Sequence, residues 1–469
     1  MNGLPRGWVE CKLEQIVSDV TYGYTAMSTF EDVGPRMLRI TDIQGNKVNW
    51  NDVPFCKITN QNQKKYLLQR GDLVFARTGA TVGKSFLISD DPPNAVYASY
   101  LIKVRSHIPD TARYLSQFFK SSLYWEQITE FSAGVGQPNV NGSKLKGLVI
   151  PLAPLAEQKR IADKLDALLA RVDAARARLD LVPAILKRFR QSVLAAATSG
   201  ELTREWRGGG DAEWKKILFE ESCSEITVGH VGKMADAYCR KGIPFLRSQN
   251  VRPFRFDPAG LMYIQVEFHK RLQKSKLKPG DVVVVRSGAP GQCCVIPESI
   301  SEANCADLVI VRPRQELLPD YACIFINSES SQVHVRSEQV GVAQQHFNVG
   351  SMKRTPLLLP TIDEQREIVR RVESLFALAD RVQAQYDHAR VKVDKLTAAL
   401  LAKAFRGELV PQDPNDEPAD KLLERLRAAP AEVEKLGVVE LPSKRTTPPG
   451  ASKPAAPARR GRSKKSDNE

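Results

Sequence analysis

The sequence predicts an α+β protein, in which two similar globular heads of mixed helix and strand are joined by two long antiparallel coiled-coil helices. The first observation is a repeat: the helical stretch 161–193 returns as 368–400, and the segments before the two copies also match. The second is the spacing of apolar residues in both stretches, which alternates between four and three as in a coiled coil. A long helix in each copy, preceded by a similar head, predicts approximate two-fold symmetry within the chain.

The repeat extends through the heads. In chain order, residues 8–13 match 214–218, 37–40 match 245–248, 71–80 match 280–289, 148–151 match 357–360, 157–158 match 364–365, and 200–202 match 407–409. The same order at a nearly constant offset indicates a duplication rather than chance similarity. We therefore expect a first head over 1–153, a spacer helix over 154–205, a second head over 206–361, a spacer helix over 362–411, and a C-terminal extension over 412–469 that is disordered from about residue 442.

Short β-branched runs bounded by Gly, Asp and Pro predict strands in both heads. They lie at 73–75 and 101–104 in the first head, and at 282–285 and 308–311 in the second. One helix is expected in each head, over 111–126 and over 321–336, and a short amphipathic helix over 420–428. The spacing between strands is irregular, so the strand order stays open.

A long helix is expected after each head. The first should cover 156–198 and stop at Gly200, with a kink at Pro183 because proline removes a backbone donor. The second should cover 363–405 and stop at Gly407.

Equal length and the same seam phase favour antiparallel pairing of the two helices; the alternative is that each helix packs on its own head. The proposed seam residues are Ile161, Leu165, Leu168, Val172, Leu179, Leu186, Ile368, Val372, Leu375, Val382, Leu396 and Leu400.

Composition restricts the class of protein. The 469 residues suffice for two or three domains, and the net charge of +14 favours a polyanionic partner, although residues 443–469 alone hold eight Lys/Arg against two acids. No leader and no membrane span are expected, because no apolar run approaches the roughly 18–20 residues that a span needs. The eight cysteines lack C-x-x-C spacing, and the six histidines lack ligand spacing, which favours reduced thiols in a cytoplasm and no metal site.

Two motifs suggest chemistry and fail on inspection. Residues 79–85 resemble a phosphate loop, but only three residues separate the first glycine from the Gly-Lys pair where the motif needs four, and the second copy at 288–293 has no Lys-Ser. Residues 90–94 resemble the Asp/Asn-Pro-Pro-aromatic tetrad of amino-methyltransferases, but Asn94 cannot stack on a flipped base. With no catalytic motif at the same place in both heads, we expect no catalytic, cofactor-binding or metal-binding residue.

Both heads share features that suit nucleic acid. An Arg-Thr/Ser-Gly sequence follows a strand in each, and a loop rich in Gly, Gln and Asn comes later; Arg, Gln and Asn pair with bases, while hydroxyls and glycine amides suit phosphates. Basic residues also precede the shared strand. The candidate DNA-binding residues are Lys64, Lys65, Arg77, Thr78, Gly79, Lys84, Gln137, Asn139, Lys270, Arg271, Lys274, Lys276, Arg286, Ser287, Gly288, Gln344, Gln345 and Asn348. The alternative is that these loops stabilise turns and that the arginines form structural ion pairs.

The order of these motifs resembles the specificity subunit of type I restriction–modification systems over about residues 4–425. The start at 4–8 (LPRGW), the helix openings at 157–160 (EQKR) and 364–366 (EQR), and the end at 407–414 (GELVPQDP) carry the resemblance. The basic tail beyond residue 442 has no counterpart in it.

The resemblance implies a noncatalytic subunit with two target-recognition domains, each reading one half of an asymmetric bipartite sequence in double-stranded DNA. The paired helices would set the separation of the halves and bind two modification (methyltransferase) subunits, through which restriction subunits join. S-adenosylmethionine, ATP and magnesium would belong to those partners. The remaining alternatives are a coiled-coil scaffold with protein-binding heads and a nucleic-acid methyltransferase.

Overall fold

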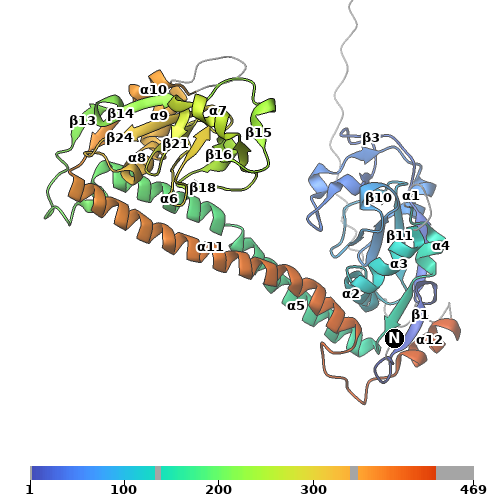
Figure 1. Ribbon diagram of the computed structural model, residues 1–469. Coiled ribbons are helices and arrows are strands. Elements are labelled where there is room, and N and C mark those ends of the chain that lie inside the picture. The colour runs from blue at the N-terminus through green and yellow to red at the C-terminus, as the bar shows by residue number, and fades with distance from the viewer. Residues whose placement is uncertain (1–2, 133–138, 338–346, 429–469) are drawn as a thin grey trace, which may run out of the picture. The chain divides into compact units, whose positions relative to one another are not determined.

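The computed structural model describes residues 3–132, 139–337 and 347–428. These residues form two compact units: the first combines the chain up to residue 167 with the part from 398 onward, and the second covers 168–397 (Figure 1). The predicted disorder from about residue 442 lies outside the described residues. None of the described helices has both the length and the apolar character that a membrane crossing requires.

A four-stranded antiparallel sheet forms the centre of the first unit. Its order is β2 (Val17–Tyr22), β11 (Leu101–Ser106), β8 (Asp72–Ala76) and β9 (Ser85–Leu87). A second sheet has the order β10 (Ala95–Tyr97), β4 (Arg36–Leu38), β7 (Phe55–Cys56) and β3 (Ser28–Thr29), and β1 (Val9–Lys12) pairs with β12 (Val149–Leu152). The strands predicted at 73–75 and 101–104 are confirmed.

The second unit repeats this topology. The order β14 (Cys223–Val228), β24 (Leu308–Pro313), β21 (Val282–Val285) and β22 (Cys293–Val295) matches the first central sheet strand for strand. The other sheet contains β15 (Tyr238–Cys239), β19 (Met262–Ile264), β16 (Ile243–Leu246), β23 (Ala303–Cys305) and β20 (Lys276–Leu277), and β13 (Lys215–Leu218) pairs with β25 (Pro356–Leu359). The parallel pair of β16 with β23 corresponds to that of β4 with β10. The internal repeat is therefore a repeat of fold.

The prediction of one helix per head after the central strands is wrong in both copies, where two helices are found. They are α2 (Pro109–Phe118) and α3 (Ser122–Ser132) in the first unit, and α8 (Pro319–Ile326) and α9 (Glu329–Ser337) in the second. A serine makes the break in each case: Ser121 Oγ accepts from Tyr124 N, and Ser328 Oγ accepts from Ser331 N. A side-chain oxygen in this position caps a new helix.

The first long helix is divided where a kink was predicted. It consists of α5 (Leu155–Leu179) and α6 (Val182–Ser199), and Pro183 lies in the first turn of α6. Pro183 has no N–H to donate to the Leu179 carbonyl, and its ring would meet that carbonyl, so the hydrogen-bond ladder is interrupted between α5 and α6, whereas proline is tolerated in the first turn of a helix. The second helix, α11 (Ile362–Phe405), is continuous. Gly200 and Gly407 follow the two helices with φ of 87° and 73°, the left-handed conformation that ends helices.

Antiparallel pairing of the helices is seen within the second unit, where α11 lies alongside α6 and the end of α5 (Figure 1). Asp394 contacts Arg176 at 3.3 Å and Asp380 contacts Arg190 at 2.7 Å, so residue numbers rise along one helix as they fall along the other. Arg390 joins Asp180 between them. These pairs are largely exposed and each contributes roughly 0.2–1 kcal/mol.

The proposed seam residues differ in burial. Ile161, Leu165, Val172, Leu186, Ile368 and Val372 are buried. Leu168, Leu179, Leu375 and Leu400 are half-buried. Val382 and Leu396 are 38% and 44% exposed, so at these two positions of α11 the side chains face solvent in this chain alone. The best-buried seam residues lie where the helices leave the heads.

Candidate nucleic-acid interface

An arginine follows the same central strand in each unit, and its backbone is held in the same way. Arg77 comes after β8, and its carbonyl accepts from Val140 N at 3.1 Å. Arg286 comes after β21, and its carbonyl accepts from Phe347 N, also at 3.1 Å. Each central sheet thus presents its own arginine at the corresponding strand end, beside a residue that follows the polar loop.

The side chain of Arg286 is neutralised by a carboxylate. Its Nη1 donates to Asp307 Oδ1 at 2.7 Å, and its Nε donates to the Phe347 carbonyl at 3.3 Å. Ser287 Oγ donates to the other oxygen of Asp307 at 3.2 Å. In the second unit, the shared Arg-Ser pair therefore forms a closed structural cluster.

The side chain of Arg77 has different neighbours. Its guanidinium lies over the Tyr22 ring, 5.0 Å from the centroid, and its buried Nε has no hydrogen-bond partner. Tyr22 is 41% exposed, and its hydroxyl accepts from Gly142 N at 2.9 Å. Across residues 3–132, 139–337 and 347–428, no carboxylate pairs with Arg77. Its positive charge remains available to an acceptor from outside, such as a base edge or a phosphate.

The other loop residues of the first unit lie close to Arg77. Thr78 forms an isolated antiparallel bridge with Asn139, whose side-chain Oδ1 is buried without a hydrogen-bond partner. Gly79 starts a short turn with φ of 82°, and Lys84 is exposed after it. Gln137, Gln344 and Gln345 lie outside the described residues, and Gly288 has φ of 87° and is exposed.

Asn348 caps a helix. Its Oδ1 accepts from Ser351 N at 2.9 Å at the start of α10 (Val349–Lys353). In the first unit Asn141 caps α4 (Gly142–Lys146) in the same way, accepting from Lys144 N at 2.8 Å. The counterpart of Asn348 is therefore Asn141, which sequence reasoning missed. An asparagine placed just before a short helical run was the available signal.

The predicted basic residues lie at helix ends in both units. Lys64 and Lys65 are in the last turn of α1 (Asn60–Tyr66), both exposed. Lys270 and Arg271 end α7 (Val266–Arg271), with Lys274 exposed in the next turn.

Lys276 forms an ion pair with Glu302, which also contacts His269. Hydrogen bonds from Lys276 and His269 hold the pKa of Glu302 below its ordinary value. Lys276 is thus engaged within the head, unlike the exposed lysines around it.

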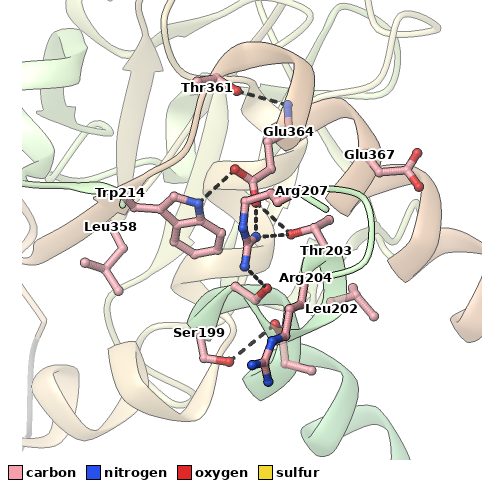
Figure 2. Close-up of polar contacts among 12 residues, drawn as sticks. Ser199, Leu202, Thr203, Arg204, Arg207, Trp214, Leu358, Thr361, Glu364 and Glu367 are labelled. Carbon is pink, nitrogen blue, oxygen red and sulfur yellow. Dashed lines mark hydrogen bonds and ion pairs between the residues drawn. The ribbon is translucent and has the colours of Figure 1, made fainter. Parts of the chain in front are cut away.

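Each unit also contains a tryptophan–glutamate contact at the base of its long helix, buried in the first unit and partly buried in the second. In the first unit, Trp8 Nε1 donates to Glu157 Oε2 at 3.0 Å. In the second, Trp214 Nε1 donates to Glu364 Oε2 at 2.9 Å, as Figure 2 shows. The next residue of each helix, Gln158 or Gln365, donates to a carbonyl just before the helix. These residues appeared in the sequence only as repeat matches, because a contact across about 150 residues of chain leaves no local pattern.

Comparison with known proteins agrees with this architecture. Residues 23–183 match the family model described as the type I restriction modification DNA specificity domain. The chain is 32% identical to the EcoKI specificity subunit of Escherichia coli K12, over 91% of this chain and 96% of that protein. It is 31% identical to the StySPI specificity subunit of Salmonella potsdam, with the same coverages.

Two solved structures share the fold. One, from a study of complex assembly in the type I R-M system, has a TM-score of 0.63 at 20% identity and covers 87% of this chain and all of its own. The HsdS subunit from Thermoanaerobacter tengcongensis has a TM-score of 0.58 at 19% identity and covers 87% of this chain and 98% of its own.

Proposed function

We propose that each head of this chain reads one half of an asymmetric bipartite DNA sequence, because the chain belongs to the family of type I restriction–modification specificity subunits. Specificity subunits are the noncatalytic DNA-recognition members of these systems. The observation that carries the proposal is that the two heads share one central sheet but differ in the partner of its arginine, Tyr22 for Arg77 and Asp307 for Arg286. Two heads that read different half-sites need a common scaffold and different contact residues.

The helices supply the separation in this proposal. Half-sites read from one face of DNA lie about 34 Å, or one helical turn, apart, or at multiples of that distance. A continuous helix such as α11, with 44 residues, is stiff enough to set such a distance. The domain limits 1–153, 154–205, 206–361, 362–411 and 412–469 belong to this proposal.

The partners are also part of the proposal. The ligand is double-stranded DNA, and two modification subunits bind the helices and bring the restriction subunits with them. S-adenosylmethionine, ATP and magnesium are bound by those partners in the cytoplasm, and this chain supplies no cofactor site. The similarity to specificity subunits of type I restriction enzymes supports the DNA ligand and the partner subunits.

Replacement of Arg77 by alanine is expected to weaken binding of the specific DNA by roughly 10- to 100-fold, since a bidentate arginine–base contact contributes about 1–3 kcal/mol of discrimination. Arg286→Ala is the matched control, because Asp307 already occupies that guanidinium. Affinity of the assembled complex, measured at several salt concentrations, separates the cases: a lost phosphate contact lowers the salt slope by about one, and a lost base contact leaves it unchanged. Equal losses for both variants would contradict the assignment of Arg77 as the free reader.

Exchange of residues 1–153 for the first head of another specificity subunit should change one half of the methylated motif and leave the other half intact. Sequencing of methylated bases in a host genome, with and without the gene, measures this directly. A change in both halves would refute independent heads. A coiled-coil scaffold with protein-binding heads predicts no methylation motif that depends on this gene.

Insertion of four residues, about one helical turn, into both α6 and α11 should change the gap between the half-sites while both half-sites stay the same. The same methylation mapping reads the gap. An unchanged gap would mean that the helices do not set the distance, and an insertion in α11 alone serves as the control for local disruption.

A further inference from the structure

In the second unit, the buried Glu364 carboxylate has partners on both oxygens (Figure 2). Trp214 Nε1 donates to Oε2 at 2.9 Å, and Thr203 Oγ1 donates to Oε1 at 2.7 Å. Arg207 Nη1 also donates to Oε1, and its Nη2 donates to the Gly200 carbonyl at 2.7 Å. The Arg207 guanidinium lies 5.9 Å from the Trp214 ring centroid. A planar cation with several donors thus completes this site.

The first unit builds only half of the same site. Trp8 Nε1 donates to Glu157 Oε2 at 3.0 Å, and Glu157 is 1% exposed. Its other oxygen, Oε1, is buried and has no hydrogen-bond partner. A buried acceptor without a partner destabilises the fold, and more so when it carries a charge.

Sequence explains what is missing. The segment 200–207, which closes the site in the second unit, corresponds to 407–414 after the second helix. Val410 stands where Thr203 donates its hydroxyl, and Pro414 stands where Arg207 supplies its guanidinium. Neither replacement has a side-chain donor, so this segment leaves Glu157 Oε1 unpaired.

A pocket of about 480 Å³ lies at this position. Glu157 lines it together with Trp8, Asp413, Asp416 and Asp420, and Arg6 lies exposed along it. Arg160 pairs with Asp416 at 2.5 Å beside the pocket. The carboxylates outnumber these cations, so the pocket favours a positively charged occupant.

We propose that this pocket receives an arginine side chain from another polypeptide, whose guanidinium takes the place that Arg207 fills in the second unit. Trp8 and Glu157 correspond to the ring and the carboxylate that Arg207 meets. A guanidinium offers a flat face and several donors at fixed angles, whereas an ammonium is a compact charge. Binding of an arginine at this pocket does not depend on DNA recognition, and so it goes beyond the proposed function.

Among the residues that the structure describes, the arginine lining the pocket is Arg6, and it is the internal competitor for this site. Arg6 precedes Trp8 and therefore matches position 212 of the repeat, which is an alanine, rather than position 207. No hydrogen bond or ion pair joins Arg6 to Glu157 in the described part of the chain.

Titration of the full chain with Nα-acetyl-L-arginine amide, followed by the indole N–H resonances of its five tryptophans, tests the proposal. Single Trp→Phe replacements assign the signals. The Trp8 signal should move saturably, with a dissociation constant on the order of 1 mM, and the Trp214 signal should stay because Arg207 occupies its site. Glu157→Gln should weaken binding by at least about tenfold, since a hydrogen bond to a charged group contributes about 1.5–3 kcal/mol. Arg207→Gln should open the second site, so that the Trp214 signal moves as well.

Several results would overturn the proposal. A Trp8 signal that stays still in the wild-type chain, while the Trp214 signal of Arg207→Gln responds, excludes the site. A response that appears only after Arg6→Gln assigns the pocket to Arg6. Equal binding of Nα-acetyl-L-lysine amide removes the preference for guanidinium. Tighter binding of free L-arginine, whose α-ammonium could meet the surrounding aspartates, would point to a free amino acid instead of a polypeptide.

Discussion

Replacement of Glu364 by glutamine is expected to destabilise the second unit by about 3 kcal/mol, because it leaves the largely buried Arg207 guanidinium without its counter-charge. The side chains of Glu364 and Arg207 are 5% and 14% exposed, so water cannot replace the lost partner. Glutamine has nearly the shape of glutamate, so the change leaves no cavity. With its oxygen toward Trp214, its amide nitrogen faces Arg207 and Thr203, so the change removes the charge and one acceptor. Hydrogen exchange measured by mass spectrometry on peptides from 168–397 follows this unit alone, which matters because a two-unit chain has no single free energy of unfolding.

The matched control is Glu157→Gln, which is expected to leave the first unit as stable as before or more stable at neutral pH. Glu157 has no cation bound to its buried Oε1, and burial raises the pKa of this carboxyl above its ordinary value of 4.5. The folded state therefore binds the proton more tightly than the unfolded state does. The destabilising effect of the carboxylate is complete above the raised pKa and disappears as the pH falls below 4.5.

The difference in stability of the first unit between Glu157→Gln and the wild-type chain should follow the ionisation of Glu157. Any gain from Glu157→Gln is expected at pH 7–8 and should vanish near pH 4, where both side chains are neutral. Urea unfolding combined with hydrogen exchange on peptides from 3–132 reads the first unit at each pH. A loss of stability from Glu157→Gln equal to that from Glu364→Gln would show that both carboxylates are satisfied alike, against the geometry of the two sites.

The repeat and the central strands could be predicted from sequence because their signals are local. The strand at 282–285 is a run of four valines and appears as β21 with the same bounds. Helix division in the heads could not be predicted from apolar spacing, which continues across the break. Ser121 and Ser328 cap the second helix of each pair through their side chains, and a serine within an apolar pattern is equally compatible with a continuous helix.

The candidate nucleic-acid interface also has a part that could be predicted from sequence and a part that could not. The two arginines at the ends of β8 and β21 were predicted from their shared motif. Their different surroundings were not predicted, because the contacts come from other strands. Arg286 pairs with Asp307, which directly precedes β24, and Arg77 lies over Tyr22 at the end of β2. Such contacts depend on strand order, which irregular spacing had left open. The half-built Glu157 site required the same information, since its tryptophan is distant in sequence.

Replacement of Phe405 by alanine is expected to destabilise the first unit by about 3–5 kcal/mol, the usual effect of truncating a buried phenylalanine. Phe405 is 2% exposed at the end of α11. Its ring centroid lies 5.3 Å from that of Tyr114 and 5.3 Å from that of Phe118, in edge-to-face arrangements. Residues 398–405 belong to the first unit, so the change removes part of the packing by which the end of this helix joins that unit.

The internal repeat supplies the comparison that makes this prediction specific. Thr198 occupies the corresponding position at the end of α6, and its hydroxyl donates to the Leu194 carbonyl at 2.9 Å. Thr198→Ala removes no ring and should lower the stability of the second unit by roughly 1 kcal/mol. Phe30→Ala, at a residue 76% exposed in the first unit, should change little. Phe405→Ala should reduce hydrogen-exchange protection mainly in peptides from 3–132. An equal loss of protection in peptides from 168–397 would contradict the assignment of this aromatic contact to the stability of the first unit.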